Sequence, residues 1–207
     1  MMLPRLMSLA IGTTALLLAG CAVGESSSVG GPEKEGSRSP VGVVDSSMSI
    51  EEGLRRFREG LPIVSELELG ESSRAALVTR FVRGLERSDT NDLRAMAITR
   101  SEFAYLYYPT SPFTRPPTVQ VAGLVWFFNI QSSQTGLTRA MRRYGGKPLH
   151  YLGHSCSAPP IHEGLNTLWS TCTLRVSNPT DTGDLGLFGS IIEREGRFKF
   201  FSYANDF

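Results

Sequence analysis

The chain has 207 residues, and its 21 Lys and Arg side chains nearly balance 20 Asp and Glu side chains. This length is sufficient for one domain with a hydrophobic core and is short for two. The balanced charge provides no basic excess for nucleic acid and no acidic block for a polycationic partner, so we expect no nucleic-acid partner.

An uncharged, largely apolar run from Leu6 to Gly20 follows a basic start that contains Arg5. A basic segment, an apolar segment and small residues before a processing site are the parts of a secretory signal. The run has about 15 residues, fewer than the roughly 20 that a helix needs to cross the hydrocarbon core. We therefore interpret residues 1–20 as a signal peptide rather than a membrane-spanning helix.

The run ends in Leu18-Ala19-Gly20-Cys21. This segment resembles the lipobox of bacterial lipoproteins, in which the cysteine thiol receives a diacylglycerol and the preceding peptide is removed. The resemblance implies acyl chains such as palmitate on Cys21, and two or more such chains hold a protein stably on a bilayer. An ordinary cleaved signal, with Cys21 incidental, is the alternative.

The resemblance also implies a location. Lipoproteins with an aspartate after the lipidated cysteine tend to stay at the inner membrane of Gram-negative bacteria, and Ala22 stands at that position here. We therefore expect a lipid-anchored protein of the cell envelope. In a Gram-negative organism it would lie on the outer membrane and face the periplasm.

Residues 22–47 are rich in serine, glycine and proline and show no apolar periodicity. This composition predicts a flexible tether, and a coil of about 26 residues has a span of roughly 28 Å. We therefore divide the chain into a signal peptide at 1–20, a lipidated cysteine and tether at 21–47, and a single domain at 48–207.

The first part of this domain carries helix signals. Ser49 precedes Glu52 by three positions, which is the spacing of a capping box, and Thr99 precedes Glu102 in the same way. The pattern at 119–133 fits a buried helix or a strand, and its length and lack of turn signals favour a helix. The expected helices cover approximately residues 49–61, 72–86, 89–97, 99–108, 119–133 and 137–144.

After residue 147 the pattern changes to alternating strands. Residues 178–183 have the composition of a turn, and Glu195-Gly196 predicts a tight hairpin turn. This order predicts an α+β fold, with N-terminal helices packed on a curved antiparallel sheet formed mainly by the C-terminal third. The expected strands cover residues 149–156, 166–177, 185–193 and 197–204.

The ending from Ile191 to Tyr203 looks like the last hairpin of the cone-shaped α+β domains of the nuclear transport factor 2 superfamily. In that superfamily early helices pack into a strongly curved sheet and leave a pocket, so the resemblance implies a pocket here. It covers residues 72–207 and rests on pattern, without a diagnostic motif. The helical material between 118 and 145 departs from the simplest members.

Cys156 and Cys172 remain as a pair once Cys21 is lipidated, and a pair of cysteines in an exported protein favours a disulfide. Two free thiols, or a metal site with nearby histidines, are the alternatives.

All three histidines, His150, His154 and His162, fall close to Cys156 and Glu163. On a strand, positions 150, 154 and 156 project to one face, where imidazole and thiolate would suit zinc. The chain has neither a His-Glu-x-x-His motif nor paired Cys-x-x-Cys motifs, and an oxidised Cys156 is no ligand. We therefore expect no metal and no other cofactor.

A nucleophilic site finds no support, because the segment around Gly153-His154-Ser155 lacks the second glycine of a nucleophile elbow. We assign no catalytic residue.

Aromatic side chains either form an ordinary core or line an apolar cavity with polar tips. The candidate pocket residues are Tyr105, Tyr107, Trp126 and His154. The arginines 139, 142 and 143 form either a solvated helix face or a contact to an anionic surface.

These observations favour a non-enzymatic ligand-binding or protein-interaction module. Its expected partners are the lipid bilayer, through acylated Cys21, and a protein of the envelope. One alternative is a small-molecule enzyme of the cone-shaped superfamily, with a cyclase- or isomerase-like activity. A structural component of an envelope assembly is the other.

Overall fold

The computed structural model describes residues 48–177 and 182–205. All of them belong to one compact unit, Asp45–Phe207. The predicted signal peptide, Cys21 and the tether lie outside the described residues, as does most of the turn predicted at 178–183.

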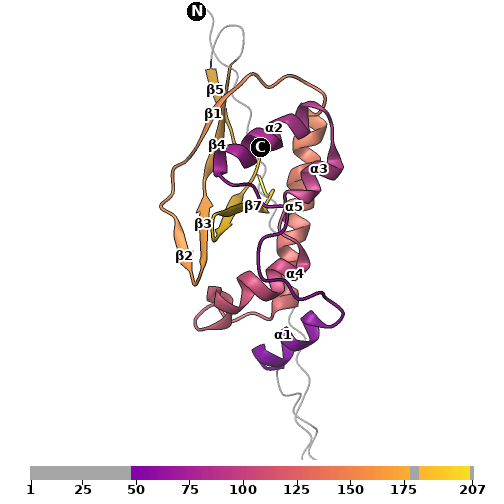
Figure 1. Cartoon of the computed structure of the whole chain (residues 1–207), viewed down its shortest axis with the longest axis vertical. Coiled ribbons are helices and arrows are strands. Elements are labelled where there is room, and N and C mark those ends of the chain that lie inside the picture. Colours follow the sequence, from indigo (N-terminus) through magenta and orange to yellow (C-terminus); the bar gives the residue numbers. More distant parts are fainter. Residues whose placement is uncertain (1–47, 178–181, 206–207) are drawn as a thin grey trace, which may run out of the picture. The chain divides into compact units, whose positions relative to one another are not determined.

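Helices form the first part of the described chain, and in Figure 1 helices α2, α3 and α5 lie on one side of the strands. A short helical segment, α4, continues into a π-helical turn, η1, and two 3-10 turns, η2 and η3. The bounds are α1 (Ile50–Arg58), α2 (Arg74–Glu86), α3 (Thr90–Ala95), α4 (Arg100–Glu102), η1 (Phe103–Tyr107), η2 (Tyr108–Thr110), η3 (Pro112–Thr114) and α5 (Ala122–Tyr144).

Side-chain caps explain where α1, α2, α3 and α4 begin. Ser49, Ser73, Asp89 and Thr99 each accept a hydrogen bond from the backbone N–H three residues further on. At Thr99 the reciprocal bond is also present, because the Glu102 carboxylate accepts the Thr99 N–H, and the predicted capping box is confirmed there.

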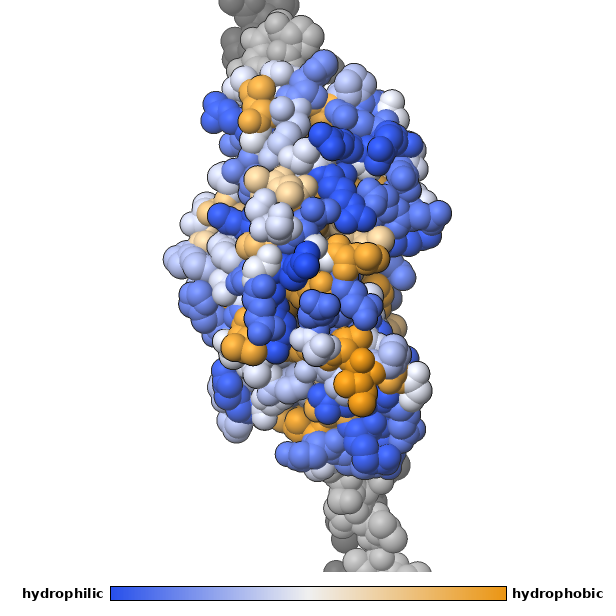
Figure 2. All heavy atoms as spheres, viewed as in Figure 1, coloured by the Kyte–Doolittle hydropathy of each residue, from blue (hydrophilic) through white to orange (hydrophobic). Residues whose placement is uncertain are grey.

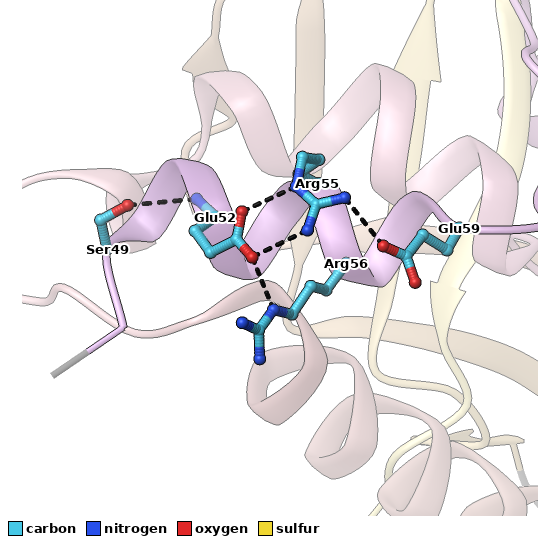
Figure 3. A network of polar contacts seen from close by, with 5 residues as sticks. All are labelled: Ser49, Glu52, Arg55, Arg56 and Glu59. Carbon is cyan, nitrogen blue, oxygen red and sulfur yellow. Dashed lines mark hydrogen bonds and ion pairs between the residues drawn. The ribbon is translucent and has the colours of Figure 1, made fainter. Parts of the chain in front are cut away.

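At Ser49 only the hydroxyl half of the predicted capping box is found, because the Glu52 carboxylate binds arginines instead (Figure 3). Glu52 accepts hydrogen bonds from Arg55 and Arg56, and Arg55 also bonds Glu59. The bonds from Arg55 and then Arg56 lower the pKa of Glu52 to about 2. These ion pairs are exposed to solvent, so they support the single helix α1 rather than a site.

Two helix predictions need correction. Helix α1 ends at Arg58, because Gly60 adopts a left-handed backbone with φ of 75° and turns the chain before Pro62. The two helices predicted at 119–133 and 137–144 are one continuous helix, α5. The segment predicted at 119–133 is therefore helical from Ala122 onward and forms no strand.

The strands form two antiparallel sheets, β1-β4-β5 and β2-β3-β6-β7, so the α+β class is confirmed. The bounds are β1 (Tyr151–Cys156), β2 (Ile161–Glu163), β3 (Asn166–Ser170), β4 (Cys172–Ser177), β5 (Thr182–Leu185), β6 (Ser190–Arg194) and β7 (Arg197–Ser202). The predicted hairpin at Glu195-Gly196 joins β6 to β7.

The strand predicted at 166–177 is broken at Thr171, whose φ of 52° is left-handed. The break bends the chain, so that β3 and β4 pair in different sheets. The strand predicted at 185–193 is likewise divided between β5 and β6. The short hairpin between β2 and β3 was not predicted, because its apolar residues are few.

Two hydrophobic cores lie on opposite faces of β6 and β7. Ile191 and Phe200 belong to the core formed with α2 and α3. Their neighbours Ile192 and Phe201 pack into the core around Phe103. Adjacent strand residues point to opposite faces, so this sheet is buried on both sides. On the face shown in Figure 2, hydrophobic residues remain in separate groups among hydrophilic ones, mainly in the lower half.

Candidate functional site

An open cleft of about 620 Å³ lies between α5 and the segment formed by α3 and α4. Helix α5 supplies one wall, with Trp126, Ile130, Ser133 and Leu137 among the lining residues. These residues are spaced by four, three and four positions, which places them on one face of a helix. The opposite wall includes Ala97 and Ile98, so much of the lining is apolar.

Tyr203 also lines the cleft and is 2% exposed. Its hydroxyl donates to the backbone oxygen of Leu93, and its backbone N–H donates to Ser133 Oγ at 2.9 Å. Burial raises the pKa of the Tyr203 hydroxyl well above its ordinary value. The hydroxyl therefore stays protonated at neutral pH and holds α3 against α5 rather than exchanging a proton.

Two exposed arginines lie at the cleft, Arg94 on α3 and Arg100 on α4. The Arg100 guanidinium stacks over the Phe57 ring at 4.5 Å and donates to the Phe57 backbone oxygen. Arg94 has no hydrogen bond or ion pair with another described residue. The residues that line the cleft within the described ranges include no carboxylate, so the cleft has a positive charge.

A second hollow of about 440 Å³ continues along α5. It shares Arg94, Leu137 and Thr138 with the first and adds Met141 and Arg142. The two hollows together form a groove that follows more than half of α5. We call it the α3–α5 groove.

The four candidate pocket residues do not line one pocket, although Tyr105, Tyr107 and Trp126 share the core around Phe103. Trp126 lines the α3–α5 groove, where its ring lies 5.2 Å from that of Phe103. Tyr107 is buried against Phe201, and Tyr105 lies under the guanidinium of Arg58. These last two tyrosines belong to the packing of η1 and are not lining residues of the groove.

His154 lies on β1, where its Nδ1 is 3.1 Å from the Tyr151 hydroxyl oxygen. Burial, and then the nearby Arg74, lower the pKa of His154. It is therefore neutral at physiological pH, and it is not among the residues that line the α3–α5 groove with Trp126.

Cys156 and Cys172 form the predicted disulfide, with an S–S distance of 2.05 Å. The two residues are direct partners in the register of β1 and β4. The alternatives of free thiols and a cysteine metal ligand are thereby removed.

The three histidines are also separated. His150 precedes β1 with a left-handed backbone, and the register shifts between Tyr151 and Gly153, so the expected alignment of 150, 154 and 156 on one strand face does not form. His162 contacts Thr167 across the β2–β3 hairpin. Among residues 48–177 and 182–205, no group of three His, Cys, Asp or Glu side chains is placed to hold a metal.

A buried polar cluster lies where η1 meets the sheet. The π-helical turn leaves the Leu106 carbonyl available, and Asn166 Nδ2 donates to it at 2.8 Å. Beside it, Glu163 is 8% exposed, and its Oε2 has no hydrogen-bond partner. Burial raises the pKa of Glu163, although Arg115 and the Tyr107 hydroxyl act in the opposite direction. The cluster fixes η1 to β2 and β3.

Sequence reasoning missed Arg94, Arg100 and Thr138. The two arginines lie on short, separate helices, so no spacing rule brings them together. One signal in the sequence could have indicated Thr138. It follows Trp126, Ile130 and Gln134 at intervals of four, on an uncharged face of α5.

No known protein family, curated protein or solved structure matches the chain. Within the part of the chain that the structure describes, no helix is long and apolar enough to cross a membrane.

Proposed function

We propose that this chain is an exported, lipid-anchored protein of the cell envelope whose domain binds an elongated anionic amphiphile in the α3–α5 groove. The ligand class is a molecule with an apolar chain and a carboxylate or phosphate group. The observation that carries the proposal is the combination of an apolar helical wall with the guanidinium of Arg94, which has no partner among the described residues.

The size and lining of the groove support binding. Small-molecule sites are typically clefts of about 300–1,000 Å³ with apolar walls and a few polar groups. The first hollow, at about 620 Å³, falls in that range. A guanidinium presents a planar set of donors that matches a carboxylate or a phosphate, so Arg94 and Arg100 suit an anionic head group.

The lining favours binding over acid–base catalysis. Its titratable groups within the described residues are Arg94, Arg100, Arg142 and Tyr203. Arginine stays protonated in proteins, and the Tyr203 hydroxyl is bonded to the Leu93 carbonyl. The hydroxyls of Thr99 and Thr138 are bonded to backbone groups of Glu102 and Gln134. The arginine guanidinium groups that remain thus serve to bind an anionic ligand rather than to transfer a proton.

The envelope location is supported by the lipobox-like segment and by the disulfide, since disulfides persist mainly in oxidising compartments. Mass spectrometry of the N-terminus of protein isolated from its own cells tests this part. We expect a chain that starts at an acylated Cys21, and Cys21→Ser removes the acyl mass and the stable anchoring that the acyl chains provide. A native N-terminus elsewhere, without acyl mass, contradicts the anchor.

Ligand binding is tested with dodecyl phosphate as the anionic probe and dodecanol as its neutral counterpart. The protein is the chain from residue 21 onward with Cys21→Ser. We expect saturable binding of dodecyl phosphate in calorimetry below its aggregation threshold. Arg94→Ala weakens that binding about ten-fold or more, because a charge-assisted hydrogen bond contributes about 1.5–3 kcal/mol.

Arg83→Ala is the matched control, since Arg83 is an exposed arginine on α2 outside the groove lining. It leaves the affinity for dodecyl phosphate unchanged. Equal affinities of Arg94→Ala and the unsubstituted chain for dodecyl phosphate, or equal affinities of the unsubstituted chain for dodecanol and dodecyl phosphate, would contradict a role for the arginine.

A further inference from the structure

A long uncharged stretch includes most of α5. No Asp, Glu, Lys or Arg occurs between Arg115 and Arg139. Within it, Leu124, Phe127 and Phe128 on α5 are 43%, 52% and 54% exposed. Leu124 precedes the two phenylalanines by three and four positions, so the side chains are neighbours on the helix surface. The two phenylalanine rings lie 5.6 Å apart.

These three side chains belong to neither hydrophobic core. The buried face of the same helical turns carries Ala122 and Val125, which belong to the core around Phe103. Val119, just before the helix, is 46% exposed and extends the apolar surface. We call Val119, Leu124, Phe127 and Phe128 the α5 patch.

The α5 patch lies at the end of the domain where the N-terminal chain enters. Helix α1 packs against the start of α5, as Figure 1 shows at the lower end of the domain. A Cβ placed on Gly53 of α1 would lie 3.2 Å from Val121 and 3.6 Å from the sulfur of Met48. Met48, the first described residue, is itself apolar and 45% exposed.

We propose that the α5 patch docks the domain on the surface of the lipid bilayer. This inference rests on the proposed lipid anchor, because Cys21 precedes Met48 by only 27 positions. A chain of this length spans at most about 90–97 Å when fully extended, so an anchored domain stays close to the membrane. Docking is then intramolecular, and the effective concentration of a short flexible linkage is on the order of millimolar, so a weak apolar contact is sufficient.

The chemistry of the patch favours lipid over a second copy of the chain. Exposed aromatic and aliphatic side chains on the part of α5 before Arg139, which has no charged residue, insert into the boundary between head groups and acyl chains with no charge to desolvate. A stable protein interface uses roughly 20–30 residues on each side, whereas the patch has four.

Vesicle flotation tests the docking separately from the anchor. The chain from residue 21 onward with Cys21→Ser is mixed with phosphatidylcholine vesicles at low and at high salt. We expect it to float with the vesicles equally at both salt concentrations. Phe127→Ser with Phe128→Ser reduces the floated fraction by roughly ten-fold, because both substitutions remove apolar area from the contact. Leu124→Gln alters the patch independently and is expected to reduce the floated fraction by a smaller amount.

Leu152→Ser with Ile161→Ser is the matched control, because these side chains are 58% and 54% exposed but lie on β1 and β2. This variant floats like the unsubstituted chain. Circular dichroism confirms that each variant is folded.

Three outcomes would overturn the docking. The first is equal flotation of the patch variants and the control, and the second is flotation that disappears at high salt. The third is a dimer in sedimentation that the patch variants dissociate while no chain floats. If any of these outcomes is found while native protein carries an acylated Cys21, the proposed lipid anchor stands and only the proposed docking is rejected.

Discussion

The ammonium group of Lys199 on β7 lies 2.9 and 3.0 Å from the two carboxylate oxygens of Glu102 in α4, and both side chains are buried. The same carboxylate accepts the backbone N–H groups of Glu68 and Thr99. The Glu102 carboxylate thus connects the loop at Glu68, the start of α4 and strand β7. Its hydrogen-bonding capacity is filled by these partners, which is what allows a charge to remain in the core.

Glu102→Ala is expected to lower the free energy of unfolding by about 3–5 kcal/mol, because it leaves the Lys199 ammonium buried without its partner. Denaturant unfolding followed by circular dichroism measures the change. Glu59→Ala is the control: it removes the exposed pair with Arg55 and is expected to cost less than about 1 kcal/mol. A cost for Glu102→Ala no larger than that of the control would contradict the structural role of the buried pair.

Two glycines of α5 are expected to respond in opposite directions to alanine. A Cβ at Gly136 would lie 1.8 Å from the backbone oxygen of Tyr203, so Gly136→Ala forces apart α5 and the chain after β7. We expect a loss of about 1–3 kcal/mol or more in unfolding free energy. A Cβ at Gly123 meets only Phe57, at 3.7 Å, and Gly123→Ala is expected to add up to about 1 kcal/mol through helix propensity.

Thermal denaturation of the two alanine variants beside the unsubstituted chain measures this difference. Equal melting temperatures for the two variants would show that the close approach at Gly136 is absent in solution.

Reduction of the Cys156–Cys172 disulfide is expected to lower the melting temperature of the domain. The bridge closes a loop with a sequence separation of 16 residues. For such a loop the chain-entropy estimate is roughly 3 kcal/mol. The double variant Cys156→Ala with Cys172→Ala serves as the control, since its melting temperature does not respond to reductant. Two titratable thiols in natively purified, denatured protein would show that the bridge does not form in the cell.

Glu163 is expected to make stability depend on pH. Burial raises its pKa in the folded domain above the value of about 4.3 in an unfolded chain, so the folded state binds the proton more tightly. The resulting stabilisation is complete below the unfolded pKa and is lost as the pH rises through the folded pKa. Glu163→Gln cannot lose a proton, so its stability relative to the unsubstituted chain increases from about pH 4 toward neutral pH.

Unfolding curves between pH 4 and pH 8 measure this difference. Glu66→Gln, at an exposed position, is the control and is expected to leave the pH profile unchanged. A constant difference between Glu163→Gln and the unsubstituted chain across this range would refute the raised pKa.

The sequence by itself determined the features that depend on neighbours in the chain. The hydroxyl of Thr99 and the carboxylate of Glu102 are three residues apart, so the capping box could be predicted from spacing. The hairpin at Glu195-Gly196 followed from turn chemistry in the same way. The disulfide could be predicted by counting cysteines, because Cys172 was the one other cysteine within the predicted domain that could pair with Cys156.

Only the tertiary structure decided the features that depend on contacts distant in sequence. The sequence predicts separate helices at 119–133 and 137–144, but α5 is continuous through Gly136, where the missing Cβ admits the Tyr203 backbone. Thr171 lies within the single strand predicted at 166–177, but its left-handed backbone breaks that strand. As a result β3 and β4 belong to different sheets. The groove beside Arg94 exists because Tyr203, more than a hundred residues later in the chain, hydrogen-bonds to Leu93 and Ser133 and holds α3 against α5. Local spacing carries no information about such a contact, since it forms only when the sheet and the helices pack together.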